Sequence, residues 1–368
     1  MINLLRLLPI FFLFGKAECG QTVAVSAGGK LTVFRVTESQ LLEAQSIELG
    51  GASGPFEMSP DRKLLYINTS LAGEEKPVPA LATFAIGKDG LLEHIHTAAS
   101  GWNSGYLSSD ATGKFLAGNS YRNGVVGIWR LEADGIYRGA EPMVFDLEKK
   151  AHSAVFSPDN RFLYVPATGP NKIFQLVFNS DTGALHPNQP SSAPGPKAET
   201  DARQPRHIIL HPEIDIAYTT NEREMAGVGV WQFDREKGLL ESVHGIPSVA
   251  GDGEGMTTAD LHLSVDSRFL FVSNRDIKNR KAAQGRDAIA VFAVNEKTGE
   301  LSFVKRFPCE RIPRSFAVGL EGKLLFVGGQ GDNKLGVYRI DEANGHLSKL
   351  ETHGLPGSPG WVFVIPAD

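Results

Sequence analysis

His152, Arg206, Glu222, Arg275 and Arg314 are residues of the types that carry out acid–base chemistry on an anionic substrate. A histidine or glutamate side chain can exchange a proton with a substrate, and guanidinium groups bind a carboxylate, a phosphate or a developing oxyanion. These residues are far apart in the sequence, so they form one site only if the fold brings them together. The alternative is that an Arg–Glu pair merely ties neighbouring elements of the fold to each other.

Each of these residues borders a copy of one repeated segment. Every copy has an apolar strand pattern, a turn rich in Asp, Gly or Pro, and a second apolar strand pattern. The copies cover residues 55–70, 105–121, 151–169, 206–222, 259–275 and 315–330. Third and fourth strand patterns follow, and the unit recurs about every 50 residues, which is typical of a four-stranded β-propeller blade.

Six of these units are complete, and the two ends of the chain supply a seventh. Residues 360–366 have the pattern of a first strand, whereas residues 22–49 have the pattern of strands two to four. Pairing these segments would close the ring and remove its exposed strand edges. We therefore predict an all-β protein, a seven-bladed β-propeller with four-stranded blades, as a single domain over residues 20–368.

Equivalent positions in successive blades lie around one axis. Counting along the repeat therefore shows whether the candidate residues occupy equivalent positions and so lie close together. Counting seven residues back from each turn acid gives the start of the innermost strand, at Gly54, Asn103, His152, Arg206, Ala259 and Arg314. Counting four forward from the marker of the second strand gives Ser70, Tyr121, Thr168, Glu222, Arg275 and Gln330. Because the two strands are antiparallel, both sets should lie at one mouth of the channel.

The predicted catalytic residues are His152, Arg206, Glu222 and Arg275, and the predicted substrate-binding residues are Arg314, Asn103, Tyr121 and Gln330.

Long connections should open on this same mouth. They cover residues 71–79, 187–204, 247–258 and 276–287, and long loops gathered on one face are where binding is expected. The last of them carries Lys278, Arg280, Lys281 and Arg286, which either attract an anionic ligand or form a solvated charged surface.

Composition narrows the classes of function. The chain has 368 residues, 42% of them hydrophobic, and a formal net charge of -5 without long basic runs, which argues against nucleic-acid binding. It contains no phosphate-binding loop, dinucleotide fingerprint or Gly-x-Ser-x-Gly elbow, so we predict no cofactor. His207, His211 and His262 lack metal-ligand spacing and are interpreted as structural, and no metal is predicted.

The N-terminus has the layout of a secretory signal peptide over residues 1–19. Arg6 precedes an apolar run at residues 7–14, and small residues follow at Ala17 and Cys19. A buried N-terminal strand is the alternative. With the signal peptide removed, Cys309 has no partner, and we expect a periplasmic or secreted, monomeric protein without a transmembrane anchor, or a cytoplasmic one if the segment is not cleaved.

Several of the segments resemble one known family. They are "HSAVFSPDNRFLYVPA" (152–167), "QPRHIILHP" (204–212), "NE" (221–222), "ADLHLSVDSRFLFVSNR" (259–275) and "GSPGWVFV" (357–364). These resemble the lactonase family of seven-bladed propellers, which includes the propeller-type 6-phosphogluconolactonases and the fungal carboxy-cis,cis-muconate cyclases. The resemblance runs from about residue 22 to the C-terminus and is greatest to the bacterial phosphogluconolactonases.

The resemblance implies cofactor-free chemistry on a lactone ring. The family's functional histidine matches His152, the arginine of its Pro-Arg-His motif matches Arg206, and its glutamate after Asn and its arginine after Ser-Asn match Glu222 and Arg275. We therefore predict a lactone hydrolase acting on an anionic sugar lactone, in which either Glu222 or His152 activates water. A carboxymuconate cyclase-like enzyme and a non-catalytic, ligand-binding exported propeller are the alternatives, and Tyr106 stands where close relatives often carry a histidine.

Overall fold

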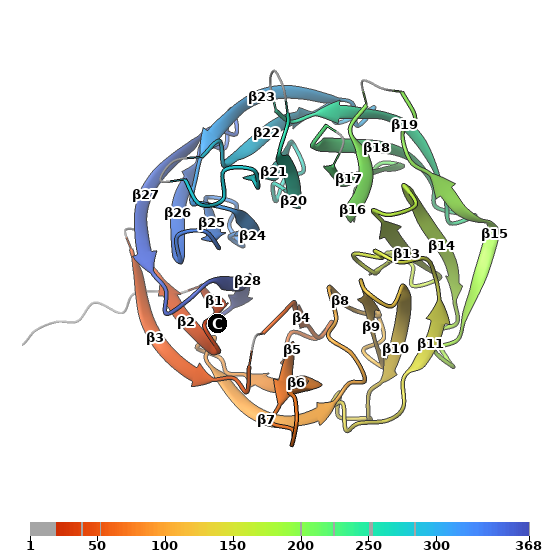
Figure 1. Cartoon of the computed structure of the whole chain (residues 1–368), viewed down its shortest axis with the longest axis vertical. Coiled ribbons are helices and arrows are strands. Elements are labelled where there is room, and N and C mark those ends of the chain that lie inside the picture. Colours follow the sequence, from red (N-terminus) through yellow and green to blue (C-terminus); the bar gives the residue numbers. More distant parts are fainter. Residues whose placement is uncertain are drawn as a thin grey trace, which may run out of the picture.

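The computed structural model describes residues 20–37, 40–51, 53–198, 201–223, 225–249, 253–282 and 285–367. In this part of the chain there is no helix, and the strands form seven four-stranded antiparallel sheets around a central channel (Figure 1). The predicted seven-bladed propeller is confirmed. The predicted signal peptide lies outside the described residues. No helix in the described part is long and apolar enough to span a membrane.

The four strands of each blade run from the channel outwards. The innermost strands are β4 (Phe56–Met58), β8 (Leu107–Ser109), β12 (Val155–Phe156), β16 (Arg203–Leu210), β20 (Met256–Leu263), β24 (Pro313–Val318) and β28 (Pro359–Pro366). The second strands are β5 (Leu64–Leu71), β9 (Phe115–Ser120), β13 (Phe162–Ala167), β17 (Ile216–Arg223), β21 (Phe269–Asp276), β25 (Leu324–Gly329) and β1 (Gln21–Ala27).

The two outer positions of each blade are filled in the same order. The third strands are β6 (Val78–Ile86), β10 (Val125–Arg130), β14 (Lys172–Phe178), β18 (Gly227–Asp234), β22 (Ala288–Val294), β26 (Lys334–Ile340) and β2 (Lys30–Val36). The outermost strands are β7 (Leu92–Ala99), β11 (Met143–Asp146), β15 (Leu185–Pro194), β19 (Leu239–Pro247), β23 (Leu301–Pro308), β27 (Leu347–Gly354) and β3 (Leu41–Glu48).

The hydrophobic core lies between the blades. Each large apolar cluster joins two neighbouring sheets, as where Val25 of β1 and Phe326 of β25 share one cluster. The second strands are buried on both faces, and the markers Tyr66, Tyr164 and Phe271 have no more than 1% of their surface exposed. The outermost strands expose much of their surface. Continuous apolar runs therefore stand where a strand is covered on both sides.

The ring closes as predicted, through the two ends of the described chain. β28 pairs with β1 in antiparallel register, from Gln21 opposite Pro366 to Ala27 opposite Pro359. One blade is thus built from residues 21–48 and 359–366 together, and β28 covers the edge that β1 would otherwise expose.

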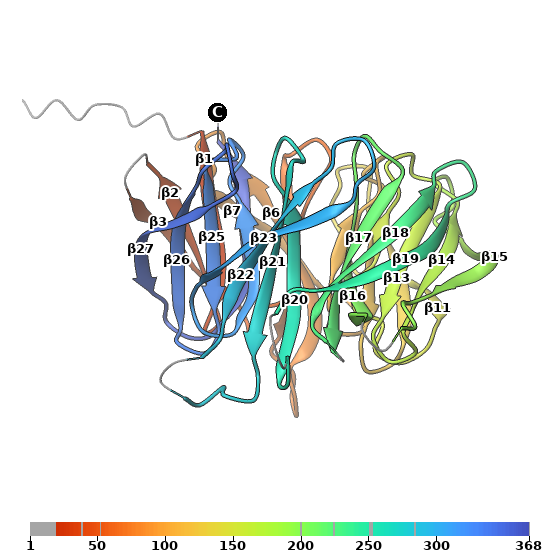
Figure 2. The ribbon, with the colours of Figure 1, turned by 90° about the horizontal axis from the view of Figure 1, so that it is seen from above.

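The two ends of the channel differ. At one end, the turns between the first and second strands are short: Ser157 Oγ donates to Asp159 Oδ1 at 2.6 Å and Asn160 adopts a positive φ of 61°. We call this end the turn mouth. The other end, where the second strands finish, we call the loop mouth. The connection that follows β21 projects on that side of the ring (Figure 2).

Candidate active site

A cavity of about 1310 Å³ opens at the loop mouth, and most of the predicted site residues line it. Asn103 and Tyr121 come from the blade of β8 and β9, and the next four blades contribute one residue each: His152, Glu222, Arg275 and Arg314. The equivalence of positions in successive blades therefore brings these six side chains together. We call this cavity the loop-mouth pocket.

Arg206 lies beneath this pocket and not on its wall. Only 1% of its surface is exposed, and its Nη1 donates to the carbonyl oxygen of Ala259 and to Nε2 of His207 at 2.9 Å. Its Nε is 3.8 Å from Oε1 of Glu222. The pairing of β16 with β17 shifts register between Pro205 and Ile208, and this bulge places Arg206 deeper than the counted position indicates. Arg206 therefore supports Glu222 from below.

Glu222 is held as an ionised carboxylate. Its Oε1 accepts a hydrogen bond from Nη2 of Arg275 at 2.9 Å, whereas its Oε2 is buried without a hydrogen-bond partner. Burial by itself raises the pKa of this carboxyl, but the charges of Arg206 and Arg275 outweigh burial and hold the pKa below its usual value. Glu222 is thus a weak base near neutral pH.

His152 is a buried, neutral imidazole. Its backbone N–H donates to the carbonyl oxygen of Pro166 at 2.9 Å, but its ring Nδ1 has no hydrogen-bond partner. The rings of Tyr121 and His207 pack edge-on against it, each with a centroid distance of 5.3 Å. Burial, and then the positive charges of Arg206 and Arg314, lower the pKa of His152 well below its ordinary value of 6.5. The ring is therefore able to accept a proton at neutral pH.

Arg314 carries the positive charge that the site leaves uncompensated. Its side chain lines the pocket and makes no hydrogen bond or ion pair with a described residue. Arg275, by contrast, uses Nη2 to bind Glu222 and the carbonyl oxygen of Thr258, and its Nε is buried without a partner. The pocket therefore presents cationic groups to whatever occupies it.

Other polar residues of the pocket were missed by the count. Arg122 and Arg223 directly follow Tyr121 and Glu222, so extending the count by one residue would have found them. Trp102 Nε1 and Thr257 Oγ1 are buried without hydrogen-bond partners and also belong to the pocket wall. Gln330 does not reach the pocket, because its amide donates to the carbonyl oxygen of Pro359 on β28 at 3.0 Å.

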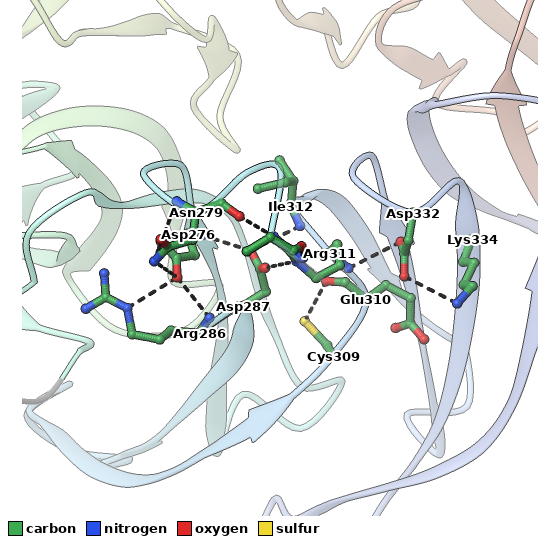
Figure 3. Close-up of polar contacts among 11 residues, drawn as sticks. Asp276, Asn279, Arg286, Asp287, Cys309, Glu310, Arg311, Ile312, Asp332 and Lys334 are labelled. Atoms are coloured by element: carbon green, nitrogen blue, oxygen red, sulfur yellow. Dashed lines mark hydrogen bonds and ion pairs between the residues drawn. The ribbon is translucent and has the colours of Figure 1, made fainter. Parts of the chain in front are cut away.

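The connection after β21 is anchored by two buried carboxylates (Figure 3). Asp287 accepts hydrogen bonds from the backbone N–H groups of Asp276 and Ile312, at 2.8 and 3.0 Å, and from Nε of Arg311 at 2.8 Å. Asp276 in turn accepts hydrogen bonds from the backbone N–H and side chain of Arg286. Both ends of the connection are thereby fixed to β21 and to the segment before β24.

The charged residues of this connection have different environments. Lys278 pairs with Glu254 at 2.8 Å, and Arg286 bonds to Asp276 and to the carbonyl oxygen of Glu254. Lys281 is exposed, whereas Arg280 lines the loop-mouth pocket and makes no ion pair with a described residue. Of the four, Arg280 is the one placed to meet a bound anion. No group of three potential metal ligands lies close together in the described part of the chain.

The fold and this pocket define a β-propeller with a cavity at one mouth of its channel that several cationic side chains line. Residues 19–364 match the family model described as "Lactonase, 7-bladed beta-propeller". The chain belongs to this family, and the predicted membership is confirmed.

The relatives that match carry lactonase names. The 6-phosphogluconolactonase of Enterobacter sp. (strain 638) is 30% identical over 329 residues, which are 89% of this chain and 93% of that protein. The 6-phosphogluconolactonase of Cronobacter sakazakii is 30% identical over 325 residues, 88% of this chain and 91% of that protein. The prediction of a lactone hydrolase agrees with both.

Two solved structures have the same fold. One is a putative 6-phosphogluconolactonase from Bacteroides uniformis, with a TM-score of 0.80 and 23% identity, covering 95% of this chain and 100% of that chain. The other is the periplasmic gluconolactonase of Pseudomonas aeruginosa, with a TM-score of 0.79 and 23% identity, covering 95% of this chain and 99% of that chain.

Proposed function

We propose that this protein hydrolyses the ring ester of an anionic sugar lactone in the loop-mouth pocket. The observation that carries this proposal is the presence, in the wall of one cavity, of a neutral histidine and an arginine without an acidic partner. His152 supplies the base, and Arg314 supplies the positive charge that ester hydrolysis requires at the carbonyl oxygen.

The reaction begins when His152 takes a proton from water as the water oxygen attacks the lactone carbonyl carbon. The oxyanion that forms is stabilised by the positive charges of Arg314 and Arg275, whose side chains line the pocket. The bond from the carbonyl carbon to the ring oxygen then breaks, and the His152 imidazolium returns the proton to that oxygen. The product is the open-chain hydroxy acid, and no cofactor is consumed.

His152 suits the role of base better than Glu222. The Oε1 atom of Glu222 already binds Arg275, and the neighbouring guanidinium groups lower the pKa of this carboxyl. A bound anion offsets the charge of Arg314, which is one of the groups that lowers the pKa of His152. Substrate binding therefore makes His152 a stronger base at the moment when it is needed.

Unpaired cations at the rim favour a substrate that carries an anionic group in addition to the lactone ring. Lys76, Arg122, Arg223 and Arg280 line the pocket without ion pairs to described residues, whereas the acidic Glu254 of the wall is already paired with Lys278. A phosphate ester would gain several charge-assisted hydrogen bonds there. The names of the Enterobacter and Cronobacter relatives support a phosphorylated sugar lactone as the substrate.

The test of the proposed function is an assay of the purified protein on two lactones, 6-phosphogluconolactone and unphosphorylated glucono-δ-lactone. We expect hydrolysis of both above the spontaneous rate, with the larger kcat/KM for the phosphorylated lactone. Rates equal to the spontaneous rate for both compounds would refute the proposal and favour a binding protein.

Arg280 is expected to discriminate between these two substrates. Replacing Arg280 with alanine should lower kcat/KM for the phosphorylated lactone roughly tenfold, the value of one charge-assisted hydrogen bond, and leave the unphosphorylated lactone unaffected. Steady-state kinetics measure both values. Lys281→Ala is the matched control, because Lys281 is exposed on the same connection and does not line the pocket. An equal loss on both lactones would contradict a role in binding the phosphate.

The pH profile should reflect the lowered pKa of His152. A histidine acts as a base only while neutral, and burial and the nearby cations favour the neutral form. Activity should therefore be retained as the pH falls through 6.5 and be lost only at lower pH, when the ring is protonated. Measuring kcat/KM between pH 4 and 8 tests this. An acidic limb at or above pH 6.5 would assign the base to another group.

We also propose that the protein is exported, on the basis of the signal-peptide pattern in residues 1–19. The Pseudomonas aeruginosa protein of the same fold is described as a periplasmic gluconolactonase. Export would separate the protein from lactones made in the cytoplasm, so the unphosphorylated lactone belongs in the assay. Cell fractionation of the full-length chain, with N-terminal sequencing of the mature form, tests the proposal, which retention of residues 1–19 in a cytoplasmic protein would refute.

A further inference from the structure

His207 and Asp260 form a buried pair directly below the loop-mouth pocket. His207 Nδ1 lies 2.9 Å from Oδ1 of Asp260, and the two side chains are 2% and 6% exposed. Both residues stand in irregular stretches of innermost strands, where β16 and β20 shift register against β17 and β21. Such bulges turn side chains away from the regular alternation of a strand.

The hydrogen bonds of His207 fix one tautomer. Its Nε2 faces Nη1 of Arg206 at 2.9 Å, and an arginine can only donate, so this Nε2 must accept. Its Nδ1 must then carry the proton and donate it to Asp260. Burial and the charge of Arg206 lower the pKa of His207 to about 4, which agrees with a neutral ring at pH 7.

Asp260 is itself fixed from several sides. Its Oδ1 accepts the backbone N–H of Leu261 at 3.1 Å, and its Oδ2 accepts the backbone N–H of Phe316 at 3.4 Å and lies 3.6 Å from Nε2 of His262. Burial opposes its charge, but the contacts with His262 and His207 keep the pKa of this carboxyl below its usual value. Asp260 is therefore an ionised, rigid acceptor.

We infer that Asp260 and His207 are positioning residues for hydrolysis. They hold Arg206, and through Arg206 they hold the Glu222 carboxylate that binds and orients Arg275. The chain of contacts runs from Asp260 to His207, to Nη1 of Arg206, and from Nε of Arg206 to Oε1 of Glu222. His207 also packs edge-on against His152, with ring centroids 5.3 Å apart. This inference rests on the proposed function.

Neither residue meets the substrate. His207 and Asp260 line a separate cavity of about 440 Å³ at the turn mouth and are absent from the wall of the loop-mouth pocket. Any effect of their substitution on turnover must therefore pass through Arg206 or His152. Since the described cationic side chains that line the loop-mouth pocket make no hydrogen bond or ion pair with His207 or Asp260, substrate binding should be largely independent of the pair.

Two substitutions of His207 separate positioning from packing. The amide of glutamine can accept from Arg206 and donate to Asp260, whereas phenylalanine fills the space and packs against His152 but makes neither bond. We expect His207→Phe to lower kcat roughly 100-fold with KM within about threefold of the wild type, and His207→Gln to recover much of the loss. A role in packing alone predicts the reverse order, with phenylalanine the more active variant, and would overturn the inference.

A spectroscopic measurement tests the pair without an activity assay. In protein labelled with ¹⁵N at histidine, the ring of His207 should be neutral and protonated at Nδ1 at pH 7, and its signals are assigned by their absence from His207→Gln. Asp260→Asn should alter this pattern and lower kcat. A His207 ring that is protonated at Nε2, or is cationic, would overturn the inference.

Glu310→Gln serves as the control for the loss of a buried acid. Glu310 is as buried as Asp260 but bonds to Lys349 and Tyr338, and does not line the loop-mouth pocket. Its substitution should leave kcat and the His207 signals unchanged. If the wild type hydrolyses no lactone, the proposed function is refuted. The ¹⁵N spectra are independent of turnover and still show whether the Asp260–His207 pair holds Arg206.

Discussion

Replacing His152 with glutamine is expected to lower kcat for lactone hydrolysis by about 10³-fold, because a general base contributes roughly 10²- to 10⁴-fold. The fold should tolerate the change. The His152 ring makes no hydrogen bond through Nδ1, and glycine, asparagine, arginine and alanine occupy the equivalent position in other blades. The loss should therefore be kinetic, with KM little changed, because the cationic side chains that line the pocket are unaltered.

Steady-state kinetics and thermal unfolding of the same preparations distinguish a kinetic loss from a structural one. His211→Gln is a matched control, because His211 is also buried but lies in the turn before β17, where its Nδ1 accepts the backbone N–H groups of Glu213 and Ile214. A His152→Gln enzyme that retains kcat within about threefold of the wild type would remove His152 from the mechanism.

Replacing Glu222 with glutamine is expected to destabilise the folded protein by about 3 kcal/mol, in addition to its effect on turnover. Arg206 and Arg275 are buried, and Glu222 is the carboxylate that both contact. Neutralising Glu222 removes the negative charge that compensates the two guanidinium groups, and these groups then remain in a poorly solvated site. The cost of leaving a buried charge unpaired is larger than the net value of the ion pair itself.

Urea-induced unfolding of the wild type and of Glu222→Gln measures this free energy. Inorganic phosphate should restore part of the lost stability, because an anion that binds only the folded state shifts the equilibrium by mass action. In the double variant Glu222→Gln/Arg275→Met the loss should be smaller than in the single variant, since one of the uncompensated charges is gone. A loss below about 1 kcal/mol in the single variant would show that the guanidinium groups do not depend on Glu222.

The architecture of the ring could be predicted from the sequence because each blade repeats the same strand and turn pattern. Continuous apolar second strands and Ser-Pro-Asp turns are local features, and the closing pair of β1 and β28 follows from the need to cover a strand edge. The exact depth of side chains at the channel could not be predicted in this way.

The count along the repeat assumes regular strands, and the differences arise where strands are irregular. Bulges in β16 and β20 place Arg206 beneath the pocket and create the pair of His207 and Asp260, residues whose spacing alone suggested no joint role. Gln330 lies one residue beyond the end of β25, where its amide binds the carbonyl oxygen of Pro359 in place of facing the cavity. Position in a repeat predicts the height of a residue in the channel, but not the direction of its side chain.

The pairing of β28 with β1 sets the order of events during synthesis. β1 leaves the ribosome before every other described strand and β28 after all of them, so the nascent chain carries an incomplete first blade until β28 has been synthesised. Until then β1 keeps an unpaired edge, which is the kind of surface that promotes association between chains. A pool of stalled or C-terminally shortened chains should therefore depend on chaperones far more than the finished ring.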